Sequence, residues 1–390
     1  MARAVDVAPA GPATLPSTGL GRGWEGPALL GVALLLLSFG LVSLYSASAF
    51  LARRQHLPDT WYVTRQASGA LVGLGAMLVC SRVPYRWWRA LAWPLLFCTW
   101  ILLVIVVLPG TEAVAPRVNG ARRWLNLGVT IQPSELAKIT MVVWTAALAV
   151  KKQELFRSLR QGLLPFLLIW AVLVLPVVLE PDLSTACLLL LLGGLVVFAA
   201  GGRIGHFLFL GALGAPLLWT QLRVAFRAER LASFLDPAAD PKGAGFQVHQ
   251  SLVALGSGGL TGVGFGEGRQ KFGFLPEPHN DFIFALIGEE WGFLGVIFVV
   301  ALYMALILIG FRIARRAPDF FGQLLAMGFT NLIALQAVLH MAVGLGLVPA
   351  TGLSLPLISY GRSNLIVSLA ALGILMSVAR EAPAGPASGA

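Results

Sequence analysis

Long apolar stretches recur along almost the whole chain, and they constrain the fold more than any other feature. Each stretch approaches or exceeds the roughly 20 apolar residues that a helix needs to cross a bilayer. Of the 390 residues, 57% are hydrophobic and only 12% are charged, against about 25% charged in an ordinary soluble domain. The sequence therefore predicts an all-α polytopic membrane protein with about ten transmembrane helices. The predicted spans are residues 27–50, 63–82, 90–109, 135–150, 163–180, 183–201, 205–221, 281–311, 322–348 and 362–380.

The segments around these spans predict a simple domain organisation. Residues 1–26 are rich in Ala, Pro and Gly, and we expect a disordered cytoplasmic N-terminal tail. Residues 27–380 form the membrane domain, and residues 381–390 form a cytoplasmic C-terminal tail. Residues 222–280 are too polar to insert, which predicts one large extracytoplasmic loop between helices 7 and 8. The fourth span, 135–150, is short and is the weakest of the ten.

Basic residues in the short loops predict the orientation, because cytoplasmic loops carry an excess of Lys and Arg. This rule places both termini in the cytoplasm and the large loop outside. The basic residues on the predicted cytoplasmic side are Arg82, Arg86, Arg89, Lys151, Lys152, Arg157, Arg160, Arg312, Arg315 and Arg316.

Further basic residues lie on the predicted outer side, and two explanations for them stay open. They could pair with outer carboxylates such as Glu135, Asp182 and Asp236, or they could face an anionic ligand such as phosphate or pyrophosphate.

The stretch LPEPHNDFIFALIGEE carries carboxylates from a polar loop into an apolar helix. A charge inside the membrane costs roughly 2.5–3.5 kcal/mol on insertion scales, so at least one of Glu289 and Glu290 needs a partner in the bundle. Asp281 begins this helix, where it is either a plain helix N-cap or a functional carboxylate. Glu277, His279 and Asp281 alternate, as in an extended strand or an irregular loop. This spacing is weak evidence for a metal, and we assign no metal ligands.

Three other polar stretches lie on the predicted outer side. These are NGARRWLNLGVTIQPSELAK, which suits an interfacial segment, LEPDLSTA at a break between two helices, and GLSLPLISYGRSNLI, a loop punctuated by Gly and Pro. Together they could line a polar cavity. The residues alone leave open two classes of function: an enzyme that acts on a lipid-linked anionic substrate, or a transporter for one.

These motifs resemble, in order, those of the SEDS family of proteins (FtsW, RodA and SpoVE). The similarity covers nearly the whole membrane region. It rests on LVSLYSAS, VTRQ, NGARRWLNLG with QPSELAK, EPDLSTA, the glycine-rich segment that ends in GRQKFGFLPE, LPEPHNDFIFALIGEE and LPLISYGRSNLI. The IGEE and YSAS sequences are more similar to the FtsW branch than to RodA.

The resemblance implies a peptidoglycan glycosyltransferase of cell division with ten transmembrane helices. Its substrate would be lipid II, which it would polymerise on the outer face of the membrane with release of undecaprenyl pyrophosphate. The family's essential aspartate falls at Asp281, which makes Asp281 the catalytic candidate, as the base for the acceptor hydroxyl. Lys271 and Arg65 rank highest among the cations because they lie in family-like motifs. The full set of substrate-binding candidates is Lys271, Arg65, Arg269, Arg123, Arg230, Glu277, His279, Ser359 and Ser363.

The same resemblance implies the partners and the surroundings of the reaction. A single displacement at an α-linked pyrophosphate gives a β linkage, so we expect inversion. A divalent cation, Mg²⁺ or Mn²⁺, could help to stabilise the leaving group; no other cofactor is expected. The expected partners are lipid II, a class B penicillin-binding protein with transpeptidase activity and other divisome membrane proteins, but no nucleic acid. The expected location is the bacterial cytoplasmic (inner) membrane.

Three alternatives remain: a lipid II flippase, a RodA-like polymerase of cell elongation and a non-catalytic scaffold. The unusual polar motifs gather on the predicted outer side, which favours an enzyme over a transporter that must bind its cargo from both sides.

The sequence departs from the family pattern at a few positions near these motifs. Where YGGSS is usual, the chain has YGRSN, with Arg362 and Asn364 as the new residues. Asn280, Ser184 and His340 replace a frequent threonine, glycine and asparagine. Arg362 either adds a phosphate contact or closes space that a substrate needs.

Overall fold

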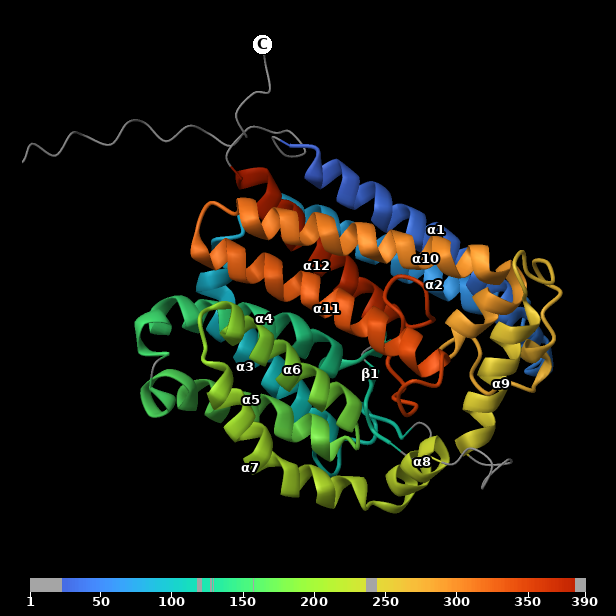
Figure 1. Ribbon diagram of the computed structural model, residues 1–390, viewed down its shortest axis with the longest axis horizontal. Coiled ribbons are helices and arrows are strands. Elements are labelled where there is room, and N and C mark those ends of the chain that lie inside the picture. Colours follow the sequence, from blue (N-terminus) through green and yellow to red (C-terminus); the bar gives the residue numbers. More distant parts are fainter. Residues whose placement is uncertain are drawn as a thin grey trace, which may run out of the picture.

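The computed structural model describes residues 23–117, 121–126, 128, 130–156, 158–235 and 244–382. Within them the molecule is a bundle of long helices that run roughly along one axis, with α8 and α9 gathered towards one end (Figure 1). The helices are α1 (Glu25–Arg54), α2 (Trp61–Arg82), α3 (Trp87–Val107), α4 (Pro133–Lys152), α5 (Leu164–Leu179), α6 (Leu183–Ala199), α7 (Ile204–Leu222), α8 (Ala225–Leu235), α9 (Ala244–Ser257), α10 (Ile283–Arg316), α11 (Phe320–Gly344) and α12 (Arg362–Glu381).

Each predicted span corresponds to one of the helices α1–α7 and α10–α12. Within the described ranges, eight helices are long and apolar enough to cross a membrane. α6 is apolar but has 17 residues, and α7 has 19. The all-α polytopic fold is therefore confirmed, and the chain is a multi-pass membrane protein.

The weakest predicted span is the most enclosed helix. In α4, 83% of the most apolar window is buried inside the protein, whereas the corresponding share of α3 is 22%. A helix surrounded by other helices faces little lipid and can carry polar side chains that find partners in the bundle. Lys138, Thr140 and Thr145 of α4 are buried in this way. The low hydropathy that made this span uncertain thus reflects its central position.

Glycines let α2 and α12 approach closely. A Cβ atom at Gly373 of α12 would collide with the backbone of Met77 on α2, and one at Gly73 would lie 2.6 Å from Leu369 Cδ1. Small residues at such contacts allow helices to pack backbone to backbone in a membrane, where no hydrophobic force drives them together. This contact fixes the start of α12, which carries the YGRSN motif, against the start of α2.

The predicted polar loop of residues 222–280 contains regular structure in its described part. It holds α8, α9 and a 3₁₀ turn, η3 (Gln270–Phe272). α9 packs on α10 and α11, where the hydroxyl of Ser251 donates to the carbonyl of Gly344 at 2.7 Å. Val248 and Ala254 of α9 are buried in this contact region. Residues 236–243 of this segment lie outside the described residues.

α10 is interrupted at Gly292, whose backbone angles, φ 66° and ψ −163°, are not helical. The interruption frees backbone groups of the helix, and the glycine-rich loop bonds to them. The N–H groups of Val263 and Gly264 donate to the carbonyls of Glu289 and Glu290, at 3.0 and 3.2 Å. In return, the N–H groups of Phe293 and Leu294 donate to the carbonyls of Gly259 and Leu260, at 2.9 and 3.1 Å.

Short irregular elements complete the fold. Residues 121–131 include an antiparallel pair of two-residue strands, β1 (Leu125–Asn126) and β2 (Thr130–Ile131). Two short helical turns, η1 (Gln153–Leu155) and η2 (Leu159–Leu163), join α4 to α5. Of the predicted tails, residues 1–22 and 383–390 lie outside the described residues.

Candidate functional site

Asp281 lies in the loop just before α10, and its side chain does not cap that helix. The N-cap residue is Phe282, and no side chain bonds to the first turn. The N–H groups of Asn280 and Asp281 both donate to the carbonyl of Glu277 at 3.1 Å, so the segment is an irregular loop and not a strand. Asp281 Oδ1 is buried and has no hydrogen-bond partner in the described part of the chain. The explanation of Asp281 as a plain N-cap is therefore wrong.

Burial controls the acidity of Asp281. It raises the pKa of this carboxyl group to about 6, and the negative charge of Glu277 adds to the rise. The positive charges of Arg230 and Arg123 act in the opposite direction and favour the ionised form. At neutral pH Asp281 is mainly ionised but basic for an aspartate, which suits a group that must accept a proton.

His279 is enclosed by aromatic rings. Its ring centroid lies 4.8 Å from that of Tyr62 and 5.6 Å from that of Tyr360, and the side chain is buried. Burial lowers the pKa of His279 to about 4. The nearby carboxylate of Glu277, 3.7 Å away, is exposed and does not offset this effect. His279 is therefore neutral, and its ring packs between Tyr62 and Tyr360 beside the turn that contains Asp281.

The LPLISYGRSN segment holds the Asp281 turn in place. Ser359 Oγ donates to the carbonyl of Asn280 at 2.8 Å and accepts from the N–H of Leu355 at 2.9 Å. The N–H of Tyr360 donates to the carbonyl of His279 at 3.0 Å. With both bonds made and its side chain buried, Ser359 supports the turn.

Gln66 of α2 ties this segment to the bundle. Its side chain donates to the carbonyl of Ser359 at 3.0 Å and accepts from the N–H of Gly361 at 3.1 Å. Gln66 belongs to the VTRQ motif but is not among the site residues predicted from the sequence. Its place in this motif was the only available signal, and the motif does not reveal which distant groups Gln66 contacts.

A buried polar cluster joins the starts of α4 and α12. Lys138 pairs with Glu135 at 2.7 Å, and Asn364 Nδ2 donates to the other oxygen of Glu135 at 3.1 Å. Ser363 Oγ accepts from the N–H of Gln132 at 3.1 Å. Asn364, a departure from the family pattern, is thus a structural partner of Glu135. Lys138, a basic residue on the predicted outer side, therefore pairs with a carboxylate, which is the first of the two explanations for the outer basic residues.

Arg123 and Glu180 meet beside the break between α5 and α6. Arg123 donates to the carbonyls of Glu180 and Pro181, at 3.2 and 2.9 Å. Glu180 is buried, and both of its carboxyl oxygens have no hydrogen-bond partner in the described chain. Burial, with the negative charge of Asp182, raises the pKa of Glu180 to about 9 although Arg123 opposes the rise. Glu180 is therefore protonated at neutral pH, and Arg123 also acts on the charge of Asp281.

Arg230 approaches the same region from α8. Its guanidinium group donates to the carbonyl of Ala350 at 3.4 Å and is otherwise exposed. Its charge reaches Asp281, as does that of Arg123. The structure therefore brings together Asp281, Glu277, Arg123 and Arg230 from three separate segments.

Lys271, the highest-ranked cation, makes internal contacts. Its ammonium group is 2.7 Å from Glu290 Oε1, 2.9 Å from Ser46 Oγ and 2.6 Å from the carbonyl of Gly266. Three acceptors use all three of its donors. The expected partner inside the bundle is confirmed for Glu290. Glu289 instead accepts from the N–H groups of Arg269 and Gln270, at 2.7 and 3.3 Å.

The two remaining arginine candidates are exposed. The guanidinium group of Arg65 lies 4.5 Å from the ring centre of Trp61, an arrangement that keeps its donors available. Arg269 presents its backbone to Glu289, and its side chain is exposed. A substrate contact by either residue stays a prediction. Arg362 packs against Gly69 of α2, so it fills space between α2 and α12.

The described residues do not assemble three His, Cys, Asp or Glu side chains around one point where they could hold a metal ion. Asp281 and Glu277 alone are too few ligands for a protein-built site, although Mg²⁺ often binds through one or two carboxylates and substrate phosphates.

Comparisons with known proteins identify the family of this chain. The family model for cell cycle proteins, FtsW/RodA/SpoVE, matches residues 27–383. A probable peptidoglycan glycosyltransferase FtsW from Trichlorobacter lovleyi is 41% identical over 93% of this chain and 94% of its own. Stage V sporulation protein E from Bacillus subtilis is 40% identical over 90% of this chain and 95% of its own.

Solved structures of related proteins match this chain in fold as well as in sequence. A chain from work on the structural coordination of polymerization and crosslinking by a peptidoglycan synthase complex has 34% identity and a TM-score of 0.74, and covers 90% of this chain and 96% of that one. The rod shape-determining protein RodA of Thermus thermophilus has 28% identity and a TM-score of 0.64, and the match covers 92% of this chain and 97% of RodA. The match over nearly the full length, in sequence and in fold, shows that this chain belongs to the FtsW/RodA/SpoVE family of cell cycle proteins.

Proposed function

We propose that this protein is a peptidoglycan glycosyltransferase that polymerises lipid II into glycan strands during cell division. Family membership and relatives named peptidoglycan glycosyltransferase FtsW support the activity. One observation supports the site above all. A carboxyl oxygen of Asp281 has no hydrogen-bond partner among the described residues, and the positive charges of Arg123 and Arg230 act on this carboxyl group.

Asp281 acts as the general base. As the acceptor hydroxyl oxygen of one sugar attacks C1 of the donor sugar, its proton passes to Asp281. The bond between C1 and the pyrophosphate oxygen breaks, and undecaprenyl pyrophosphate leaves with the bonding electron pair. Attack opposite an α-linked leaving group forms a β linkage, so the reaction inverts the configuration. A glycosidase needs a second carboxyl group as an acid for a poor leaving group, whereas pyrophosphate leaves as an anion.

Arg123 and Arg230 stabilise the charge on the departing pyrophosphate. Arginine presents several donors in a fixed planar fork that suits phosphate oxygens. Arg123 is held by two carbonyls of the α5–α6 connection, and Arg230 by one carbonyl. Because these acceptors are neutral, each guanidinium keeps its net charge for an anion.

The other candidates take supporting roles in this scheme. Arg65 and Arg269 offer exposed cations to the substrate, and Glu277 and His279 shape the turn that presents Asp281. Ser359, Ser363 and Lys271 position the loops around it through the bonds described above.

The orientation follows from the basic residues in the short loops. We place Asp281 on the outer face of the bacterial cytoplasmic membrane and both termini in the cytoplasm. The supporting observation is that one end of the bundle, away from Asp281, carries three arginines: Arg82 at the end of α2, Arg380 at the end of α12 and Arg86 just before α3.

The proposed partner is a class B penicillin-binding protein, which would crosslink the strands made here, together with other divisome membrane proteins. A solved relative belongs to work on a peptidoglycan synthase complex that coordinates polymerization and crosslinking. The exposed apolar face of α10, which includes Phe293, Leu294 and Ile297, offers a surface for a single-span partner.

The deciding experiment is a lipid II polymerisation assay on the purified chain, with and without the transpeptidase and with a chelator. Asp281→Asn should fold normally and make no glycan strands. Asp59→Asn, an exposed aspartate that pairs with Arg53 at the same end of the molecule, is the matched control and should retain activity. Normal strand length from Asp281→Asn would remove this residue from the mechanism. Lipid II translocation in sealed vesicles without polymerisation would instead indicate a flippase.

A further inference from the structure

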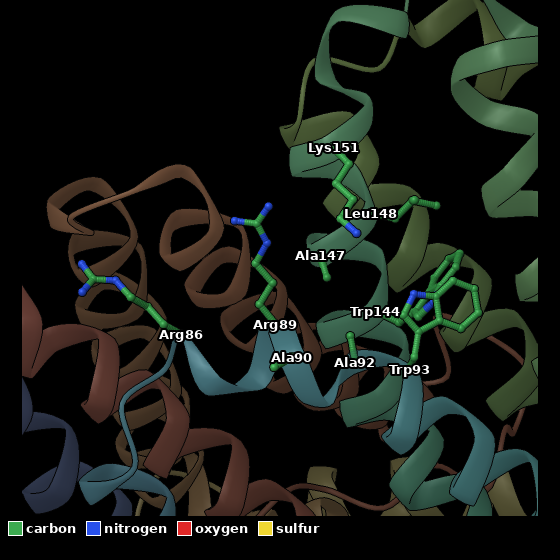
Figure 2. Close-up of a pocket in the computed structure, with 9 residues that line it drawn as sticks. All are labelled: Arg86, Arg89, Ala90, Ala92, Trp93, Trp144, Ala147, Leu148 and Lys151. Atoms are coloured by element: carbon green, nitrogen blue, oxygen red, sulfur yellow. The ribbon is translucent and has the colours of Figure 1, made fainter.

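A second cluster of cations lies at the opposite end of the bundle from Asp281. The start of α3 and the end of α4 enclose a cavity of about 280 Å³. Its wall includes Arg86, Arg89 and Lys151, with Trp93 and Trp144 on its apolar side (Figure 2). Nothing in the proposed reaction uses this cavity.

Arg89 and Lys151 are the two cations of this wall that have no side-chain partner among the residues that the structure describes. Arg86 forms ion pairs with Asp319 and Glu381, each at 3.5 Å, and extends away from the other two in Figure 2. For Arg89 and Lys151, no ion pair or side-chain hydrogen bond forms with any residue that the structure describes. Two neighbouring cations that line one cavity leave a net positive charge there.

The start of α3 adds to this positive charge, whereas the last turn of α4, where the helix dipole is negative, offsets part of the charge of Lys151. Arg89 lies in the first turn of α3, where the helix dipole is already positive, and that turn contains no acidic residue. The nearest carboxylate along the chain from Lys151 is that of Glu154, which is exposed and forms no ion pair with it within the described residues. An anion in the cavity would therefore relieve a repulsion that the protein itself leaves in place.

The rest of the wall indicates what kind of anion fits. Ala92 and Trp144 form a buried apolar floor, and the rings of Trp93 and Trp144 meet edge to face at 5.6 Å. From Trp93 the exposed face of α3 continues to Phe97, and these side chains are 56% and 61% exposed. A ligand with a phosphate at one end and an apolar chain at the other would match both parts. A tryptophan at this depth also suits the boundary between head groups and acyl chains.

We propose that this cavity binds the phosphate head group of an anionic phospholipid from the inner leaflet, with an acyl chain along the Trp93–Phe97 face of α3. Arg89 and Lys151 bind the phosphate, and the inner-leaflet location rests on the orientation proposed above. Clusters of basic residues at the cytoplasmic surface recognise anionic lipids in this way. The cavity is separate from the Asp281 site, so this inference does not depend on the glycosyltransferase mechanism.

Lipid retention tests the proposal directly. Purified protein in a neutral detergent is titrated with phosphatidylglycerol and, separately, with phosphatidylcholine, and bound lipid is counted by native mass spectrometry. The wild type should bind phosphatidylglycerol more tightly. Arg89→Ala/Lys151→Ala should weaken that binding by about a hundredfold, since a direct hydrogen bond to a charged group contributes roughly tenfold.

Two further variants separate a built site from general charge. Arg82→Ala/Arg315→Ala removes two exposed cations from the same end of the bundle and should change binding by less than about threefold. Ala90→Trp keeps both cations but fills the cavity from an exposed position in its wall, and it should reduce binding as well. Unchanged melting temperatures would show that each variant is folded.

Three results would overturn the proposal. In the first, the control pair loses as much binding as the cavity pair, which indicates diffuse attraction. In the second, phosphatidylcholine binds as tightly as phosphatidylglycerol. In the third, inorganic phosphate displaces the lipid completely at millimolar concentration, which identifies a site for free phosphate and not for a lipid.

Discussion

At the scale of single residues, Asp281 shows how burial and charge are balanced against each other. Burial and Glu277 raise its pKa, and Arg123 and Arg230 lower it, with a result of about 6. An exposed aspartate would be a weaker base, and a fully buried one without nearby arginines would remain protonated at neutral pH. The two arginines therefore have two roles, since they keep the base ionised before the reaction and face the leaving group during it.

The first prediction concerns the pH dependence of polymerisation. A base must be deprotonated, and the pKa of Asp281 is raised to about 6. The initial rate should therefore reach a plateau above about pH 7 and fall about tenfold per pH unit below 6. Rates of purified enzyme on lipid II between pH 4.5 and 8.5 would measure it. Glu277→Gln removes a negative neighbour and should shift the midpoint to lower pH; a midpoint that does not move would contradict the assigned cause.

The second prediction concerns stability at the same residue. A raised folded-state pKa means that the ionised carboxylate is less favourable in the folded state than in the unfolded state. This penalty is absent below about pH 3, where the group is protonated in both states, and grows as the pH rises from the ordinary pKa of 3.8 to about 6. Asp281→Asn should thus raise the apparent melting temperature in detergent at pH 7.5 but not at about pH 3. Equal or lower melting temperature at pH 7.5 would mean that the carboxylate is stabilised by contacts that the structure does not show.

At the scale of secondary-structure elements, the buried pair Lys271–Glu290 joins the glycine-rich loop to α10. The two side chains are 5% and 4% exposed, and Ser46 of α1 bonds to both. This pair connects three elements just behind the Asp281 turn. The pair holds the loop in position but adds little net stability, because the cost of desolvating two charges offsets most of their attraction.

The third prediction tests this pair with a double-mutant cycle. Lys271→Met or Glu290→Leu alone should destabilise the fold by about 3–5 kcal/mol, because each leaves an unpaired charge in the interior. The double variant Lys271→Met/Glu290→Leu should recover much of that loss. Denaturation in mixed detergent would measure the coupling. If lipid II binding were the main role of Lys271, its replacement would instead raise the KM and leave stability unchanged.

The elements also show what sequence patterns can and cannot predict. The ten spans were predictable because lipid demands long apolar segments, and even the weak α4 was found. The position of Asp281 followed from its motif. The contacts of Lys271 with Ser46, and of Gln66 with Ser359, were not predictable, because they join residues 225 and 293 positions apart. Apolar periodicity carries no information about which distant polar groups meet.

At the scale of the whole molecule, the proposed orientation in the membrane and the proposed partner surface each lead to a test. The fourth prediction uses truncated fusions to alkaline phosphatase. A fusion after Leu222, at the end of α7, should be active because this point lies outside, and a fusion after Arg316, at the end of α10, should be inactive. The opposite pattern would place Asp281 on the inner leaflet and exclude synthesis on the outer face.

The fifth prediction concerns the partner. Phe293→Ala/Leu294→Ala on α10 should weaken co-purification of the class B transpeptidase by about tenfold, as expected when apolar anchors are removed from the centre of an interface. These side chains are 54% and 59% exposed. The matched control is Leu71→Ala/Val72→Ala on α2, with 73% and 61% exposure, which should leave the complex intact. Equal losses from both pairs would indicate a general effect of lipid-facing residues.

The interruption at Gly292 determines how the Asp281 turn is anchored. Any residue with a Cβ atom there would collide with the backbone of Gly262 and Leu260. The first turns of α10, from Ile283 to Trp291, are bonded to the glycine-rich loop through the carbonyls of Glu289 and Glu290. A displacement of that loop would therefore be passed on to the end of α10 that follows Asp281.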